Sequence, residues 1–166
     1  QYRTGFNMSE DARFEDGREG PLRLTALDAD DLSVIAALAQ DAVFPAAEMK
    51  WDRNARRFAI LLNRFRWEDA PNAKARKRSF ERVQAVLVIE DVLKVQSQGV
   101  DKSDPDMVFS LLAITFIPGE DGAGRVELTL AGDGVIGLQV EALEVLLRDV
   151  TRPYAAPSSK APFHPE

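Results

Sequence analysis

The spacing of apolar residues changes from strand-like to helical within the first quarter of the chain. In "PLRLTAL", leucines alternate with polar residues, which predicts a short β-strand. From Leu32 to Ala42 apolar residues recur every three or four positions, so "DADDLSVIAALAQDAV" is predicted to form one amphipathic helix. Asp28 is expected to cap this helix, and Asp30 and Asp31 lie in its first turn, where the helix dipole favours negative charge.

After Pro45 the period returns to two, which predicts a hairpin with the turn "DRNAR" between "AEMKW" and "RRFAILLNRFRWE". The apolar alternation of the second strand slips at Asn63–Arg64, and we therefore expect a β-bulge there. Trp51 and Trp67 fall on the apolar parity of their own strands. This parity favours core or sheet-rim positions over a stacking platform for a ligand.

The second half of the chain is predicted to be mostly strands. "EDAPNAKARKRS" has the composition of a loop, and "FERVQAVLVIEDVLKVQSQGV" is either one long bent strand or two strands broken near Glu90–Asp91. "MVFSLLAITFIPG" is apolar enough to be a central strand that is covered on both faces. A hairpin is expected around Gly132–Gly134, and "VEALEVLLRDV" keeps a helical spacing that Pro153 would end.

These elements predict an α+β fold with about seven mostly antiparallel strands, one helix after the first strand and one C-terminal helix. By the order of elements, a bent sheet of this kind is similar to the barrel of the pleckstrin-homology superfold, although a fold does not determine a function. We expect a flexible arm over residues 1–20, a single domain over 21–152 and a proline-rich disordered tail over 153–166.

Composition excludes several classes of function. The 166 residues contain no cysteine, which rules out disulfides, thiolate metal sites and a cysteine nucleophile. The single histidine, His164, lies in the proline-rich tail, where a general base would not be held against a substrate. No apolar run approaches the roughly 18 residues of a membrane span, and the N-terminus lacks the apolar region of a secretory signal, so we expect a cytoplasmic protein.

Motifs that would hold a cofactor or a metal are weak. The carboxylates of "DKSDPD" stand at the first, fourth and sixth positions, and these do not match a calcium loop. The glycines of "GEDGAG" and "GDG" lie between predicted strands, whereas a dinucleotide-binding loop must open a helix. We therefore assign no metal site, no cofactor and no catalytic residue from the sequence.

Charge is distributed unevenly along the chain. The net charge is −6, yet the segment from Lys50 to Arg82 contains eleven basic and four acidic residues and carries +7. An acidic total argues against general affinity for nucleic acid, but a local basic sector can bind an acidic or phosphorylated protein partner. The candidate anion-binding residues are Arg64, Arg66, Lys74, Arg76, Lys77, Arg78 and Arg82. The simpler alternative is that they form a solvated loop that aids solubility.

The leading hypothesis is therefore a non-catalytic binding or adaptor domain. A second is an enzyme that uses carboxylates and arginines, which would require two acids to converge in a concave site with shifted pKa values. A third is a structural homodimer, formed by edge pairing of the apolar strands at 107–117 or 126–130.

Four segments taken together resemble a known family. They are "LRLTALDADDLSVIAALAQDAV" (22–43), "RRFAILLNRFRWE" (56–68), "RVQAVLVIEDVLKVQSQGVD" (82–101) and "LLAITFIPG" (111–119), and "LNRFRWE" is the most specific motif among them. The chain is similar to a domain-of-unknown-function family of small alphaproteobacterial proteins. The resemblance covers about residues 22–150 and implies a single-domain bacterial cytoplasmic protein; it brings no established activity, cofactor or site.

Overall fold

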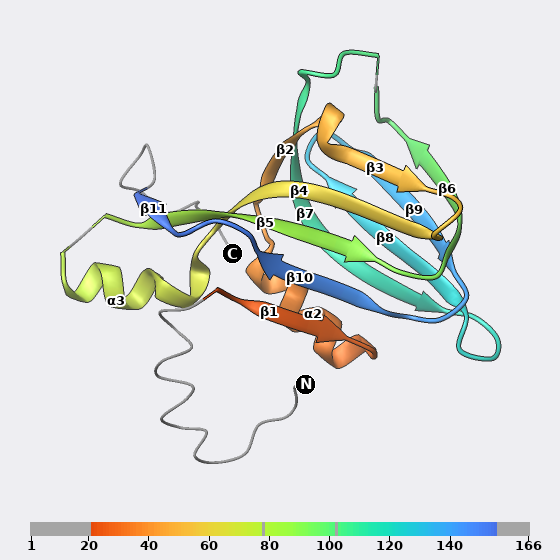
Figure 1. The fold of residues 1–166 in the computed structure, drawn as a ribbon, viewed down its shortest axis with the longest axis horizontal. Helices are drawn as coiled ribbons and strands as arrows, with labels where there is room; N and C mark the ends of the chain where they lie inside the picture. The colour runs from red at the N-terminus through yellow and green to blue at the C-terminus, as the bar shows by residue number, and fades with distance from the viewer. Residues whose placement is uncertain (1–20, 78, 102, 156–166) are drawn as a thin grey trace.

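The computed structural model of the chain describes residues 21–77, 79–101 and 103–155. This part contains eleven strands, two α-helices and two 3-10 helices (Figure 1). In chain order the elements are β1 (Arg23–Ala26), α2 (Ala29–Leu38), β2 (Val43–Pro45), η1 (Ala46–Glu48), β3 (Met49–Asp52), β4 (Arg57–Phe65), η2 (Trp67–Asp69), α3 (Ala70–Ala75), β5 (Glu81–Ile89), β6 (Val92–Gln98), β7 (Val108–Pro118), β8 (Gly124–Leu130), β9 (Gly134–Val140), β10 (Val145–Asp149) and β11 (Tyr154–Ala155). The predicted α+β class with mostly antiparallel strands is confirmed, although the strands number more than seven.

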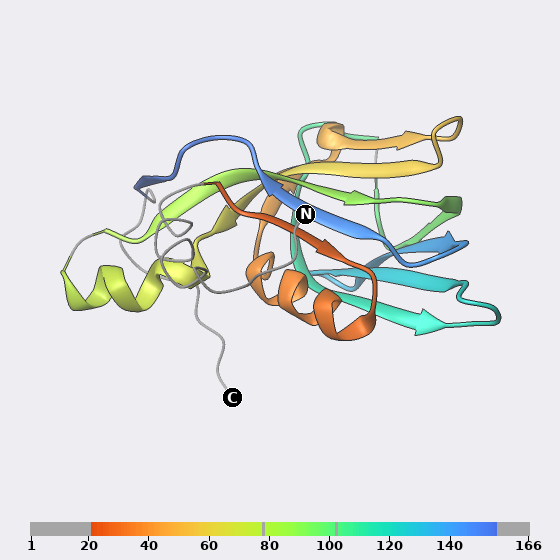
Figure 2. The same ribbon diagram turned by 60° about the horizontal axis from the view of Figure 1, so that its bottom comes forward.

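The strands form one strongly bent sheet that folds over a single apolar core. Its order is β1-β10-β5-β4-β2-β7-β8-β9-β6, while β3 adds to β4 and β11 adds to β5. Inward-facing side chains of the two halves of the sheet meet in the core, and α2 contributes Leu32 and Ile35 to it. Helix α2 contacts β1 and β7, and Figure 2 shows it beneath β1, on the side of that strand where the core lies.

Several local predictions are confirmed. The Asp28 carboxylate accepts a hydrogen bond from the Asp31 backbone N–H at 2.8 Å and so caps α2. The chain breaks at Glu90–Asp91 into β5 and β6. Between β8 and β9 it turns at Gly132 and Asp133, whose φ angles of 83° and 70° require the left-handed region.

The predicted C-terminal helix is wrong, because residues 145–149 form strand β10 between β1 and β5. The apolar residues of this segment fit a spacing of three to four and also an alternation, in which Leu143, Val145 and Leu147 are buried. Pairing with β1 and β5, which are distant in the sequence, makes this segment a strand. The local spacing of apolar residues does not distinguish the strand from a helix. Without a terminal helix, the order of elements no longer supports the comparison with the pleckstrin-homology superfold.

Strand β7 is also less buried than its composition predicts. Val108, Leu112 and Ile117 are 61%, 38% and 49% exposed, so the strand is not covered on both faces. Strands β7 and β8 lie inside the sheet order with a neighbour on each side, and the open ends of that order are β1 and β6. Strand β8 pairs with β7 along one edge and with β9 along the other, so it presents no free edge in the described structure.

Segment 64–82 extends beyond the core and carries most of the candidate site residues. We call it the extension: the end of β4, η2, α3 and the start of β5, which project to the left in Figure 1. The prediction of a loop between β4 and β5 is wrong, because η2 and α3 occupy most of this segment. Alanines favour helix, and Pro71 is tolerated in a first turn, so residues 70–75 form α3.

The chain after Pro153 was expected to be disordered, yet Tyr154–Ala155 pairs with β5 as β11. The rest of the predicted tail and the predicted arm over 1–20 lie outside the described residues.

Candidate functional site

The predicted bulge at Asn63–Arg64 is absent, and this places Arg64 inside the protein. The register of β4 with β5 runs unbroken from Phe58 opposite Ile89 to Phe65 opposite Arg82. Arg64 therefore continues the core-facing series of Phe58, Ile60 and Leu62, and its side chain is 0% exposed. A charged group in this position needs ionic and hydrogen-bonding partners, because burying an unpaired charge is very costly.

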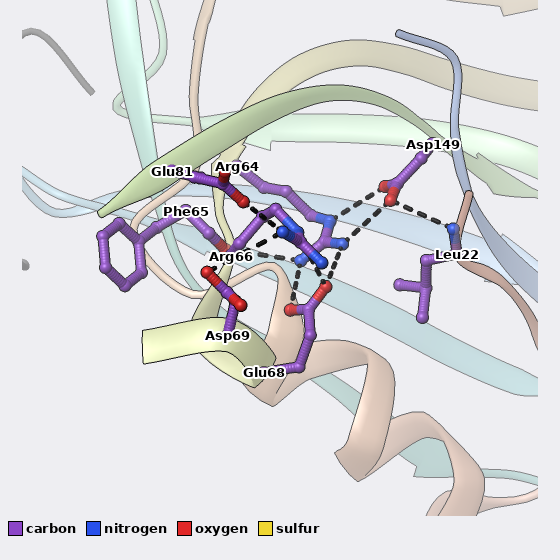
Figure 3. Close-up of polar contacts among 8 residues, drawn as sticks. All are labelled: Leu22, Arg64, Phe65, Arg66, Glu68, Asp69, Glu81 and Asp149. Atoms are coloured by element: carbon purple, nitrogen blue, oxygen red, sulfur yellow. Dashed lines mark hydrogen bonds and ion pairs between the residues drawn. The ribbon is translucent and has the colours of Figure 1, made fainter. Parts of the chain in front are cut away.

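Arg64 finds those partners in two carboxylates that come from different elements (Figure 3). Asp149 of β10 accepts from Nε and Nη2, both at 3.0 Å, and Glu68 of η2 accepts from Nη1 at 2.9 Å and from Nη2 at 2.8 Å. Nη1 also donates to the Phe65 carbonyl at 3.3 Å. A guanidinium has five N–H donors, and these five contacts use all of them. No donor of Arg64 remains for a ligand.

The same contacts shift pKa values in the direction of ionisation. Burial alone would lower the pKa of Arg64, but the hydrogen bonds and negative charges of Glu68 and Asp149 outweigh it and raise the pKa. Burial alone would raise the pKa of Glu68, but its hydrogen bonds to Arg64 and that positive charge lower it. Arg64 and Glu68 are therefore both charged at neutral pH.

Arg66 makes a second, smaller set of ion pairs beside the first. Its Nη1 lies against Glu81 in a short contact and 3.8 Å from Asp69, while its Nε is 3.7 Å from Glu68. The side chain of Arg66 is 10% exposed. We call Arg64, Arg66, Glu68, Asp69, Glu81 and Asp149 the arginine clamp. It joins β4, η2, β5 and β10, and Asp149 also accepts from the Leu22 backbone N–H next to β1 at 3.1 Å.

An apolar cluster separate from the main core supports the clamp. Phe65, Ala73 and Val83 are fully buried, and the Phe65 ring contacts Trp67 and Phe80 at centroid distances of 4.8 and 5.7 Å. The indole N–H of Trp67 donates to the Gln40 carbonyl at 2.9 Å, which fastens the extension to the chain after α2. Both tryptophans are half-buried. Trp51 lies on β3 and packs against the main core, as its parity predicts, whereas Trp67 begins η2 after β4 has ended, so strand parity does not account for its position.

The remaining candidate residues have a different environment. Lys74, Arg76 and Lys77 are exposed on α3 and immediately after it, and we call these three residues the tip. Arg82 is half-buried, with its guanidinium carbon 5.9 Å from the centre of the Phe65 ring and its Nη1 buried without a hydrogen-bond partner. Arg78 lies outside the described residues.

The structure thus divides the predicted basic sector. Arg64 and Arg66 are buried structural residues and not part of an accessible surface, whereas the tip is accessible. The sequence interpretation missed the acidic half of the clamp. Glu68 lies only four residues after Arg64, but the helical i, i+4 rule could not have paired them, because Arg64 lies on β4 and Glu68 in η2. Asp149 had no local signal either, since it reaches Arg64 only through strand pairing.

The clamp is poorly suited to acid–base chemistry. Glu68 and Asp149 do converge, but a general acid at neutral pH needs a raised pKa, and the pKa of Glu68 is lowered. Within the described residues no group of three or more acidic or histidine side chains is arranged to hold a metal ion. In the 101–106 segment, Asp101 and Asp104 instead accept from the backbone N–H groups of Ser103 and Asp106. No helix in the described ranges is long and apolar enough to cross a membrane.

Comparisons with known proteins place the chain in a family. No curated protein and no solved structure matches it. A family model described as "Protein of unknown function (DUF2948)" matches residues 22–164, which include the clamp, the tip and the whole sheet. The match spans most of the sequence and confirms that the chain belongs to an uncharacterised domain family, as the resemblance implies. The chain therefore belongs to the DUF2948 family of proteins of unknown function.

Proposed function

We propose that this protein is a non-catalytic binding module of the bacterial cytoplasm, and that its tip holds an acidic or phosphorylated protein partner. The observation that supports this most directly is the separation of charge within the extension. Its three carboxylates, Glu68, Asp69 and Glu81, all lie against Arg64 or Arg66 in the clamp. These contacts place the three carboxylates within ion-pair distance of buried arginines.

The tip is left with positive charge that the described structure does not neutralise. Among the described residues Lys74, Arg76 and Lys77 have no ion-pair partner, and no acidic residue lies between positions 70 and 80. An anionic partner is attracted to such a site from a distance and held by charge-assisted hydrogen bonds. The clamp contributes indirectly, because it fixes the extension to the sheet through Asp149 of β10 and so presents the tip in one place.

The test compares two variants with equal losses of charge. Lys74→Gln/Arg76→Gln removes one lysine and one arginine from the tip, and Arg53→Gln/Lys94→Gln removes the same pair from exposed positions elsewhere. The probes are two blocked hexapeptides, one of glutamates and one containing phosphoserines, titrated by NMR in 50 mM salt. We expect the tip variant to bind at least one peptide about three- to tenfold more weakly than wild type, since each exposed charge pair contributes up to about 1 kcal/mol.

The control variant should bind like wild type, and binding should weaken as salt is raised because exposed charges are screened. Equal affinity of the tip variant, the control and wild type for both peptides would contradict the proposal. The difference between the glutamate and phosphoserine peptides identifies which anion the tip prefers.

A further inference from the structure

A second cationic surface lies on the outer face of the sheet, away from the tip. Arg23 of β1 stands directly opposite Arg148 of β10 in the antiparallel register. Opposed residues in such a pair have Cβ atoms roughly 5 Å apart, and like charges in this arrangement destabilise the sheet. Both arginines are exposed, and neither has an ion-pair partner in the described chain.

Apolar side chains continue the same face across the neighbouring strands. The register aligns Arg148 with Val86 of β5 and Val86 with Leu61 of β4, so the row runs from two cations to two apolar residues. The next row, two residues along each strand, contains Leu146 and Val88. These four apolar residues are half-buried, and no acidic residue of the described chain belongs to either row. Acids begin one row further, where Glu90 pairs with Arg57 at 3.1 Å.

This outer face is not covered by a helix of the described chain. Helix α2 packs on the core side, where Leu32 and Ile35 are buried, and α3 contacts η2 at the end of the extension. In Figure 1 strands β10, β5 and β4 lie toward the viewer, and Figure 2 shows α2 below β1, on the opposite side.

From these rows we infer that the outer face of β1, β10, β5 and β4 is a docking surface for an acidic protein segment whose carboxylates alternate with apolar side chains. Each guanidinium presents a fork of N–H donors that matches a carboxylate, and the register places Arg23 and Arg148 side by side. A carboxylate bound between Arg23 and Arg148 would also remove the repulsion between them. Apolar neighbours of that carboxylate would then cover Val86, Leu61, Leu146 and Val88. The occupant follows from this complementarity of charge and of apolar surface, and the inference does not rest on the function proposed for the tip.

The probe is a blocked ten-residue peptide that alternates glutamate with leucine, and its control replaces each glutamate with glutamine. We expect the glutamate peptide to shift the backbone amide signals of β1 and β10, and Arg23→Gln/Arg148→Gln to weaken its binding about tenfold. Arg53→Gln/Lys94→Gln and Lys74→Gln/Arg76→Gln should leave these shifts unchanged, which separates this surface from the tip. The Arg23/Arg148 variant should unfold at the same temperature as wild type or higher, because a repulsive pair is removed.

Four outcomes would overturn the inference. Unchanged binding by the Arg23/Arg148 variant would show that the pair does not hold the carboxylate, and equal binding of the glutamine peptide would show that charge plays no part. Association of the full chain with phosphatidylserine vesicles that depends on the pair, without peptide binding, would assign the face to a membrane. A large gain in peptide affinity when Glu10, Asp11, Glu15, Asp16 and Glu19 are changed to glutamine would assign it to residues 1–20 of the chain itself.

Discussion

The clamp and the tip are made from the same basic stretch of sequence and have opposite fates. Arg64 and Arg66 are buried with all the carboxylates that the extension supplies, while Lys74, Arg76 and Lys77 are exposed with none. Whether a basic side chain stabilises the fold or is available to a partner therefore depends on the carboxylates near it and on the face of the sheet or helix where it lies. Four substitutions test whether the clamp stabilises the fold while the tip does not.

Replacing Arg64 with leucine should have the largest effect. The change leaves the buried Asp149 without its cation and Glu68 with only the longer contact to Arg66. Removing one partner of a buried ion pair typically costs about 3–5 kcal/mol. Urea unfolding followed by circular dichroism measures the loss. Arg53→Leu, at an exposed position with no ion-pair partner among the described residues, is the matched control and should change the free energy of unfolding by about 0.5 kcal/mol or less. A loss below about 1 kcal/mol in Arg64→Leu would mean that the clamp is not structural.

Arg64→Lys keeps the positive charge but removes the planar set of donors that binds two carboxylates at once. An ammonium group has three donors that radiate from one point, so it cannot bind both carboxylates with paired contacts as the guanidinium does. We expect a loss of about 1.5–3 kcal/mol, the range for hydrogen bonds to charged groups, measured by the same unfolding experiment. Full stability of Arg64→Lys would show that only the charge matters.

The third change tests the clamp through pH. The pKa of Glu68 is lower in the folded than in the unfolded protein, so its ionisation stabilises the fold at neutral pH. That contribution is lost as pH falls below the ordinary glutamate value of 4.5 and through the folded pKa. Glu68→Gln should therefore be less stable than wild type by about 1 kcal/mol at pH 7, a figure reduced for the partial exposure of Glu68.

The gap between Glu68→Gln and wild type should begin to narrow below pH 4.5, where the unfolded wild-type chain takes up a proton at Glu68, and should close as pH falls through the lower folded pKa. Unfolding midpoints measured between pH 7 and pH 3 test this. A gap that stays constant over this range would contradict the lowered pKa.

The smallest effect on stability is expected at the tip. Lys74→Gln/Arg76→Gln removes two exposed cations that have no ion-pair partner in the described chain, so the free energy of unfolding should change by about 0.5 kcal/mol or less. Thermal unfolding of this variant beside Arg53→Gln/Lys94→Gln provides the comparison. A loss of more than about 1.5 kcal/mol would mean that the tip is part of the fold.

Local patterns in the sequence predicted elements whose partners are nearby. The cap at Asp28, the break at Glu90–Asp91 and the Gly132–Asp133 turn depend on a few adjacent residues, and all three are correct. The segment at 145–149 was misassigned because its leucines fit two periods, and the choice depends on β1 and β5, which are distant in the sequence.

The candidate site, like the secondary structure, was predictable only where it depends on residues close together in the sequence. The basic stretch and the accessible tip follow from composition, but the burial of Arg64 depends on an unbroken register with β5. The slip in apolar parity at Asn63–Arg64 was interpreted as a bulge. Its actual cause is that Arg64 holds a core-facing position while Phe65, on the other face, belongs to the separate apolar cluster. A charged residue at an apolar position is thus a signal for a buried ion pair.

The central claim, that the clamp sequesters the acids of the extension so that the tip can hold an anionic partner, is tested most directly by one affinity measurement. This is the ratio of the dissociation constants of Lys74→Gln/Arg76→Gln and Arg53→Gln/Lys94→Gln for the glutamate or phosphoserine hexapeptide in 50 mM salt. We expect a ratio of about three to ten for at least one peptide, with both variants as stable as wild type. A ratio of one for both peptides would contradict it.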